Sequence, residues 1–166
     1  MTSFIERLNK HQKIGIDIDA TLIDGPKSRL LQEWCKDNHK TKELHLVTFR
    51  YNADFHFIGQ DLIDADVDIS MFRGVHGSPA ELMIEYLTLV NKVGFRWKAK
   101  NEAKWIRSLA YHKILHDDFI KVEDLAHEWK GLKCKELGLT CLIDDMEESV
   151  LPGCMKHGIE FIHSLK

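Results

Sequence analysis

Short apolar runs and stretches of helical periodicity alternate along most of this chain. The apolar runs predict five strands, near residues 13–18, 44–48, 119–123, 139–143 and 159–163. Apolar residues between them recur at the spacing of amphipathic helices, near residues 26–39, 130–138 and 146–157. Strands that alternate with helices favour a parallel sheet with right-handed crossovers. We therefore expect an α/β fold, a small Rossmann-like parallel sheet with helices on both faces.

The middle of the chain follows a different pattern. Ser78 and Pro79 are typical of a helix start, and helical spacing continues to about residue 92 and again over 98–114. We expect a single domain over residues 1–166 that carries a mostly helical insert, or small cap, within residues 51–115. Whether this insert covers a site or joins two copies in a homodimer stays open.

Two pairs of carboxylates follow two of the predicted strands. Asp17 and Asp19 come where the first apolar run ends, and Asp144 and Asp145 follow the run at 139–143. In open α/β sheets, ligands bind at the carboxyl ends of the strands. Adjacent carboxylates repel unless a cation compensates them, and Mg²⁺ is the usual cation of an oxygen-only site. The pattern favours a shared Mg²⁺; alternatively, Asp144 and Asp145 only open the helix that follows.

A hydroxyl and a lysine complete a longer pattern. The run at 44–48 ends in Thr48, and Lys130 begins the helical stretch that leads into the second acid pair. In this order the residues resemble the haloacid dehalogenase-like (HAD) hydrolase superfamily, of the phosphatase type. The four motifs of that superfamily are matched by Asp17, Asp19 and Thr21, by Thr48, by Lys130, and by Asp144 with Asp145. The resemblance leaves out the middle third of the chain.

The resemblance implies phosphoryl transfer through an aspartyl-phosphate. Asp17 would be the nucleophile, and Asp19 the general acid and then the base. Thr48 and Lys130 would hold phosphate oxygens, and Lys130 would also offset the charge beside Asp17. Arg50 either grips the same phosphate or is solvated. The Mg²⁺ ligands would be Asp17, Asp19 (through its backbone carbonyl), Asp145 and Asp144.

Two positions qualify the resemblance. Ala20 follows Asp19 where the family usually has Gly, so this loop either keeps ordinary backbone angles or carries strain. Lys133 and Lys135 compete with Lys130 for the third motif. We prefer Lys130 because it begins the predicted helix, at the end that meets the strand edges.

The composition is typical of an intracellular enzyme. The 166 residues are 44% hydrophobic and 30% charged, enough for a substantial core. The net charge of −3 argues against binding of bulk nucleic acid. Four scattered cysteines favour a reducing, cytoplasmic location over a disulfide framework. We expect neither a signal peptide nor a membrane span, because the apolar runs are too short.

Residues 96–113 carry six basic side chains and one acidic one, with Trp97, Trp105 and Tyr111 between them. Such a segment suits a nucleotide or another phosphorylated ligand, but we favour a solvated basic face whose aromatic residues lie in the core or in a dimer contact.

Two functional classes remain. The first is a Mg²⁺-dependent phosphatase that acts on a phosphomonoester such as a nucleotide or a sugar phosphate. The second is a catalytically silent HAD-fold protein that binds a partner through the helical insert. The retention of both acid pairs, Thr48 and a lysine favours the enzyme. A dehalogenase does not need the metal-binding acids, and a receiver domain has its acid pair early and its lysine late.

Overall fold

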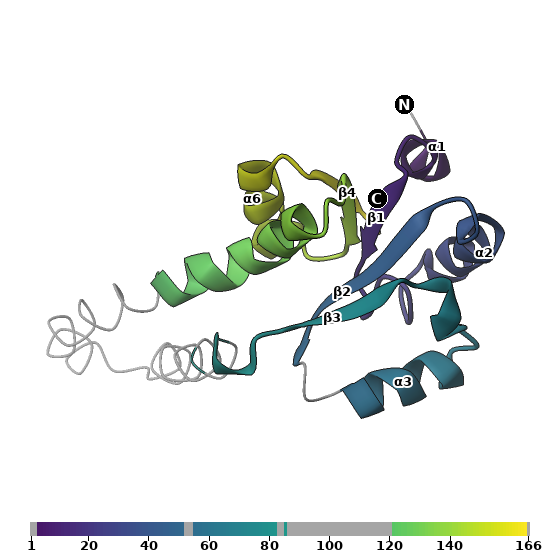
Figure 1. The fold of residues 1–166 in the computed structure, drawn as a ribbon, viewed down its shortest axis with the longest axis horizontal. Coiled ribbons are helices and arrows are strands. Elements are labelled where there is room, and N and C mark those ends of the chain that lie inside the picture. The colour runs from purple at the N-terminus through teal and green to yellow at the C-terminus, as the bar shows by residue number, and fades with distance from the viewer. Residues whose placement is uncertain (1–2, 52–54, 83–84, 86–120, 166) are drawn as a thin grey trace, which may run out of the picture. The chain divides into compact units, whose positions relative to one another are not determined.

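Five strands pair in one parallel sheet, in the order β3-β2-β1-β4-β5 (Figure 1). The computed structural model describes residues 3–51, 55–82, 85 and 121–165. The strands are β1 (Lys13–Ile16), β2 (Glu43–Tyr51), β3 (Gly74–Ser78), β4 (Cys141–Asp144) and β5 (Glu160–His163). The predicted Rossmann-like α/β fold is therefore confirmed.

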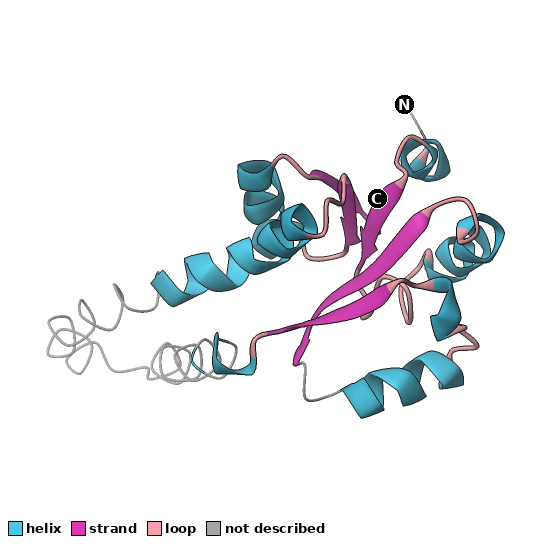
Figure 2. Ribbon diagram, viewed as in Figure 1, coloured by secondary structure: helices cyan, strands magenta, loops and turns pink. Residues whose placement is uncertain are grey.

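Helices cover both faces of this sheet (Figure 2). The described helices with defined ends are α1 (Phe4–Asn9), α2 (Ser28–Asn38), α3 (Phe55–Asp64) and α6 (Glu147–His157), with a 3₁₀ turn at Ile69–Met71. Residues 121–136 are helical as well. The helices α2 and α3 lie on one face, and α6 and the helical residues 127–136 lie on the other (Figure 1). Right-handed crossovers produce this division, because the chain adds strands to the two sides of β1 in opposite directions.

Alternate residues of β1 serve the two faces. Ile14 and Ile16 are fully buried in the core cluster that also contains Leu31 of α2 and Ile58 of α3. Gly15 points to the other face, where an added Cβ would lie 3.2 Å from the Cys134 sulfur. Because side chains alternate along a strand, the next residue on the Gly15 face is Asp17. The sheet thus directs Asp17 toward the helical residues 127–136.

The chain divides into two compact units, residues 1–78 with 127–166, and residues 79–126. The sheet belongs entirely to the first unit. The predicted helical insert, residues 51–115, therefore includes a part of the sheet, because β3 lies within this range and is an edge strand. The sequence of β3 contains a single apolar side chain, Val75, so it has no apolar run from which a strand could be predicted. The later part of the predicted insert, residues 86–115, lies outside the described residues.

Two other expectations were wrong. Residues 121–123, expected in a strand, are helical. Lys130 does not begin a helix but lies inside one, because residues 121–129 before it are already helical. Gly138 ends this stretch as expected, with a φ of +68° that glycine tolerates. Within the described part of the chain, none of the helices has the length and apolar character that a membrane span requires.

Candidate active site

The carboxyl ends of β1 and β4 bring the two acid pairs together. Asp17 directly follows β1, and Asp144 is the last residue of β4. The Asp17 N–H donates to the Ile143 carbonyl at 2.9 Å, which continues the pairing of the two strands. The strand order reverses between β1 and β4, and open α/β sheets bind their ligands at such a switch point.

Lys130 bridges the two strand ends. Its Nζ donates to Asp17 Oδ1 at 2.8 Å and to Asp144 Oδ2 at 2.6 Å. All three side chains are buried, with relative exposures of 1% for Lys130, 4% for Asp17 and 0% for Asp144. The ammonium also lies 4.3 Å from the centre of the Phe49 ring. One buried cation thus holds two carboxylates, an arrangement that orders both of them.

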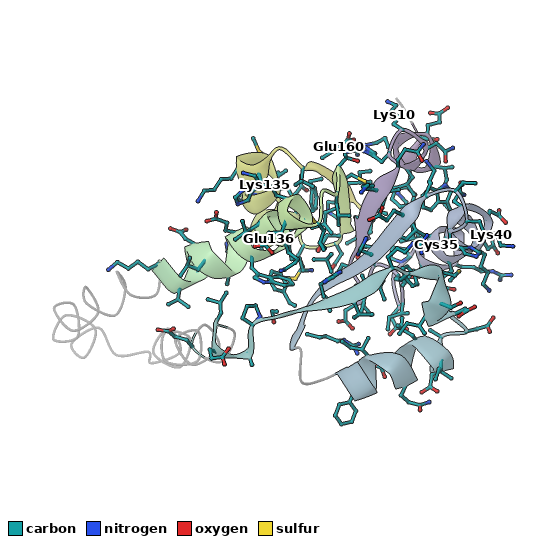
Figure 3. All side chains as sticks on the ribbon, in the orientation of Figure 1. Lys10, Cys35, Lys40, Lys135, Glu136 and Glu160 are labelled. Atoms are coloured by element: carbon teal, nitrogen blue, oxygen red, sulfur yellow. The ribbon has the colours of Figure 1, made fainter. Side chains whose placement is uncertain are left out.

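A close contact between two helices places Lys130. A Cβ on Gly131 would lie 2.3 Å from the carbonyl carbon of Gly153 in α6, so only glycine allows this approach. Of the competing lysines, Lys133 pairs with Glu136 at 2.5 Å and Lys135 is exposed (Figure 3). The structure therefore joins Lys130, and neither Lys133 nor Lys135, to the acid pairs.

Burial controls the protonation of this bridge. The pKa of Asp17 is raised from its ordinary value of 3.8 to about 7, because burial and the charge of Asp144 together outweigh the opposing effect of Lys130. Burial alone would lower the pKa of Lys130, but the two carboxylates outweigh it and raise that pKa. Lys130 therefore stays cationic, whereas Asp17 changes its charge near neutral pH.

Three carboxylates offer ligand atoms for a metal ion. Oxygens of Asp17, Asp144 and Asp145 all lie within 4.8 Å of one another. Three carboxylates and one ammonium sum to −2, which a divalent cation neutralises. The oxygen-only donor set suits a hard cation such as Mg²⁺. Burial and the charge of the neighbouring Asp144 raise the pKa of Asp145.

Asp144 also organises the turn that follows it. Its Oδ1 accepts from the Met146 N–H at 2.8 Å, and α6 begins one residue later. The alternative in which Asp144 only opens the helix is thus partly realised, since Asp144 holds this turn. Its other oxygen meets Lys130, so the same carboxylate serves both the turn and the buried bridge.

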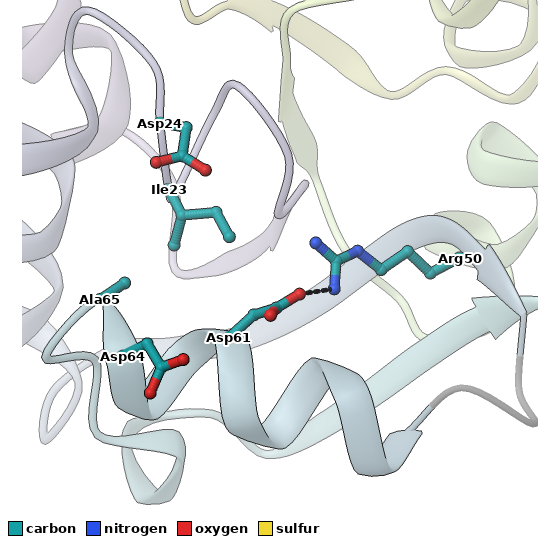
Figure 4. Close-up of a pocket in the computed structure, with 6 residues that line it drawn as sticks. All are labelled: Ile23, Asp24, Arg50, Asp61, Asp64 and Ala65. Atoms are coloured by element: carbon teal, nitrogen blue, oxygen red, sulfur yellow. Dashed lines mark hydrogen bonds and ion pairs between the residues drawn. The ribbon is translucent and has the colours of Figure 1, made fainter.

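The side chain of Asp19 lies apart from the three clustered carboxylates and pairs with Arg50. The Arg50 Nε donates to Asp19 Oδ2 at 2.8 Å, and Nη2 donates to Oδ1. A third guanidinium nitrogen, Nη1, donates to Asp61 of α3 (Figure 4). Arg50 therefore holds two carboxylates in this structure, and its predicted contact with a substrate phosphate stays a prediction.

The loop after β1 is strained at Ala20. Its φ of +52° lies in the left-handed region, which confirms the second of the two expectations for this position. The loop is tight, since a Cβ on Gly25 would come within 2.1 Å of the Ala20 carbonyl oxygen. The Ser28 hydroxyl closes it by donating to the Thr21 carbonyl at 2.8 Å. Thr21 itself is buried and bonds Ser164 beyond β5 at 3.2 Å.

Thr48 lies buried near the end of β2, which neighbours β1. Its Oγ1 accepts from the Arg50 N–H at 3.2 Å, which leaves the hydroxyl hydrogen able to donate elsewhere. A hydroxyl that binds a phosphate oxygen at this edge of the sheet would need such a hydrogen to donate.

Sequence reasoning missed several residues that shape this region. Asp61 looks like any charged residue on an amphipathic helix, and Phe49 looks like an ordinary strand residue. Gly131 and Gly153 both interrupt helical patterns, and a glycine inside a helix often has a packing reason. That signal was available in the sequence.

The chain was compared with family models, curated proteins and solved structures. No family model matches the chain, and neither the curated proteins nor the solved structures contain a match. The fold and site define an α/β protein of Rossmann-like topology, with a buried lysine and three clustered carboxylates at its switch point.

Proposed function

We propose that this chain is a Mg²⁺-dependent phosphatase that hydrolyses a phosphomonoester through an aspartyl-phosphate on Asp17. The observation that carries the proposal is the bridge from Lys130 to Asp17 and Asp144, with Asp145 beside them. A carboxylate attacks an anionic phosphate only where cations quench the repulsion. A buried lysine and a cluster of carboxylates suited to Mg²⁺ meet that requirement in one place.

The first half of the reaction transfers the phosphoryl group to Asp17. Lys130 holds Oδ1 of Asp17, so the carboxylate is oriented and its other oxygen can attack phosphorus. The bond from phosphorus to the leaving oxygen breaks, and Asp19 gives that oxygen a proton. Mg²⁺, held by Asp17, Asp144 and Asp145, would neutralise charge on the phosphate oxygens. Thr48 and Lys130 donate hydrogen bonds to those oxygens.

The second half releases phosphate. Asp19 takes a proton from water, the water oxygen bonds to phosphorus, and the bond between phosphorus and Asp17 breaks. Both aspartates then return to their starting states. Asp19 is paired with Arg50 through both oxygens, and this contact orients the carboxylate that acts as the base. To serve as the acid in the first half, Asp19 turns one oxygen from Arg50 to the leaving group, while Arg50 continues to hold the other oxygen.

We further propose a cytoplasmic location and a small phosphorylated substrate, such as a nucleotide or a sugar phosphate. Homodimerisation through the predicted insert, and a silent binding role through the same segment, both depend on residues outside the described part of the chain. No observation on the described residues favours the binding role over the phosphatase.

Phosphate release from 4-nitrophenyl phosphate and from a panel of nucleotide and sugar phosphates tests the proposal. We expect release with Mg²⁺, its loss in EDTA, and a loss of at least a hundredfold in Asp17→Asn, since the nucleophile is gone. Asp37→Asn, the same change at an exposed position of α2, should keep full activity. A folded wild-type protein that releases no phosphate from any compound contradicts the proposal.

A further inference from the structure

Arg50 connects a loop residue to a helix residue. Its Nε and Nη2 face the two oxygens of Asp19, and its Nη1 faces Asp61. The Arg50 side chain is 22% exposed, and the side chains of Asp19 and Asp61 are 54% and 44% exposed. At such exposure the charges are well screened, so the geometry of the planar fork matters more than the attraction.

The two carboxylates differ in how firmly the fold holds them. Asp61 lies on α3, which is fixed to the sheet by the buried Ile58 and Leu62 on either side of it in sequence. Asp19 lies in the loop after β1, next to the strained Ala20. A guanidinium fixed at one edge by a helix can hold the loop carboxylate at its other edge. Without Asp61, Arg50 would follow the loop rather than restrain it.

We infer that Asp61 is a positioning residue, which acts through Arg50 to hold the Asp19 carboxylate in place for proton transfer. This inference rests on the proposed function. It assigns a role to a residue that none of the four sequence motifs contains. It also explains why Arg50 contacts α3 in addition to Asp19 (Figure 4).

The test uses the leaving group as a probe of proton transfer. The value of kcat/KM covers the transfer to Asp17, the step in which the leaving group departs. Phenol is a poorer leaving group than 4-nitrophenol and depends more on protonation. In Asp61→Asn we expect kcat/KM for phenyl phosphate to fall about tenfold or more, and that for 4-nitrophenyl phosphate to fall far less.

A matched control lies one turn further along the same helix. Asp64 lines the same open cleft of about 270 Å³ as Arg50 and Asp61, but it accepts from Gln60 at 2.8 Å (Figure 4). Asp64→Asn should leave the ratio of the two esters unchanged. In an Arg50→Ala background, Asp61→Asn should have no further effect, since its path to Asp19 is already broken. Thermal unfolding of each variant establishes that it is folded.

Three results would overturn the inference. The first is an equal fall for both esters in Asp61→Asn, which indicates a general structural effect. The second is an Asp61→Asn effect that persists in full without Arg50. The third is a folded wild-type protein that releases phosphate neither from these esters nor from any nucleotide or sugar phosphate of the panel, which removes the proposed function itself. If the wild type hydrolyses both esters and Asp61→Asn lowers kcat/KM equally for both, only the inferred role of Asp61 is wrong and the proposed function stands.

Discussion

Gly131 and Gly153 lie backbone against backbone, where the helical residues 127–136 cross α6. A Cβ on Gly153 would in turn lie 2.5 Å from the His127 carbonyl oxygen, so both helices need glycine at the crossing. Lys130 precedes Gly131, and its ammonium reaches Asp17 and Asp144 from there. The crossing therefore sets how deeply the lysine enters the carboxyl edge of the sheet.

Gly131→Ala is expected to push the two helices apart. The free energy of unfolding should fall by about 1–3 kcal/mol, as in other overpacked interiors, and phosphatase activity should fall because Lys130 moves with its helix. Urea unfolding measures the first effect. Gly59→Ala in α3 is the matched control, because a Cβ there meets nothing within 4 Å. It should stabilise the protein by about 0.5–1 kcal/mol. If Gly131→Ala leaves the free energy of unfolding unchanged, the two helices do not need glycine where they cross.

Lys130→Met removes the cation between two buried carboxylates. We expect a loss of about 3–5 kcal/mol in the free energy of unfolding at pH 7, because Asp17 and Asp144 are then left buried without compensation. Lys133→Met deletes a partly exposed partner of Glu136 and should cost less than about 1 kcal/mol. Equal losses in urea unfolding of the two variants would show that Lys130 is not the organising charge.

The sequence predicted the fold class and the proximity of the two acid pairs, and the physical reason is the same for both. Asp17 and Asp144 each end an apolar run, and the carboxyl ends of parallel strands meet at one edge. Their proximity therefore followed from the pattern. Lys130 contacts Asp17 and Asp144, although it lies inside a helix and not, as the sequence had suggested, at its start. Its full burial depends on carboxylates far away in sequence, which no local pattern contains.

Other features depended on tertiary contacts alone. The edge strand β3 is only partly buried over Gly74–His76, so it needs no apolar run, and its sequence reads as a loop. The sequence around Asp61 does not indicate its role, because its partner Arg50 comes from the end of β2. From the sequence, Ala20 left two alternatives open, an ordinary backbone or a strained one. The structure was needed to decide for strain.

Ala20→Gly should relieve that strain. An alanine in the left-handed region costs about 1 kcal/mol, so the glycine variant should unfold at a higher temperature despite the extra freedom of its unfolded chain. Ala65→Gly is the comparison, since Ala65 is not among the described residues with positive φ and packs against the core. That variant should be less stable than wild type. A lower melting temperature in Ala20→Gly would contradict the strain at this position.

Asp145→Asn should separate metal binding from stability. In EDTA the variant should be at least as stable as wild type, because a carboxylate that repels Asp144 is gone. At a Mg²⁺ concentration a hundred times Kd, wild type should gain about 2.7 kcal/mol, and Asp145→Asn much less. Glu148→Gln, which removes an exposed first-turn acid of α6, should gain as much as wild type. Thermal unfolding across a Mg²⁺ titration measures all three, and equal gains for wild type and Asp145→Asn would exclude Asp145 as a ligand.

The raised pKa of Asp17 predicts how stability depends on pH without metal. The unfolded chain releases this proton near pH 3.8 and the folded protein near pH 7. Between these values the folded state binds more protons, so stability should fall as pH rises and level off above pH 7. A shift of about three units corresponds to about 4 kcal/mol. Lys130 stays protonated throughout and adds no slope.

Asp17→Asn isolates this contribution. The difference in unfolding free energy, wild type minus Asp17→Asn, should fall by about 3 kcal/mol from pH 4 to pH 7, measured by urea unfolding in EDTA. The exposed Asp37→Asn keeps Asp17 and should follow wild type across the range. A difference that rises with pH would mean that Lys130 outweighs burial and lowers the pKa of Asp17. In that case Asp17 is ionised throughout the neutral range even without a bound metal, and Mg²⁺ would be needed only to offset the charge of the phosphate.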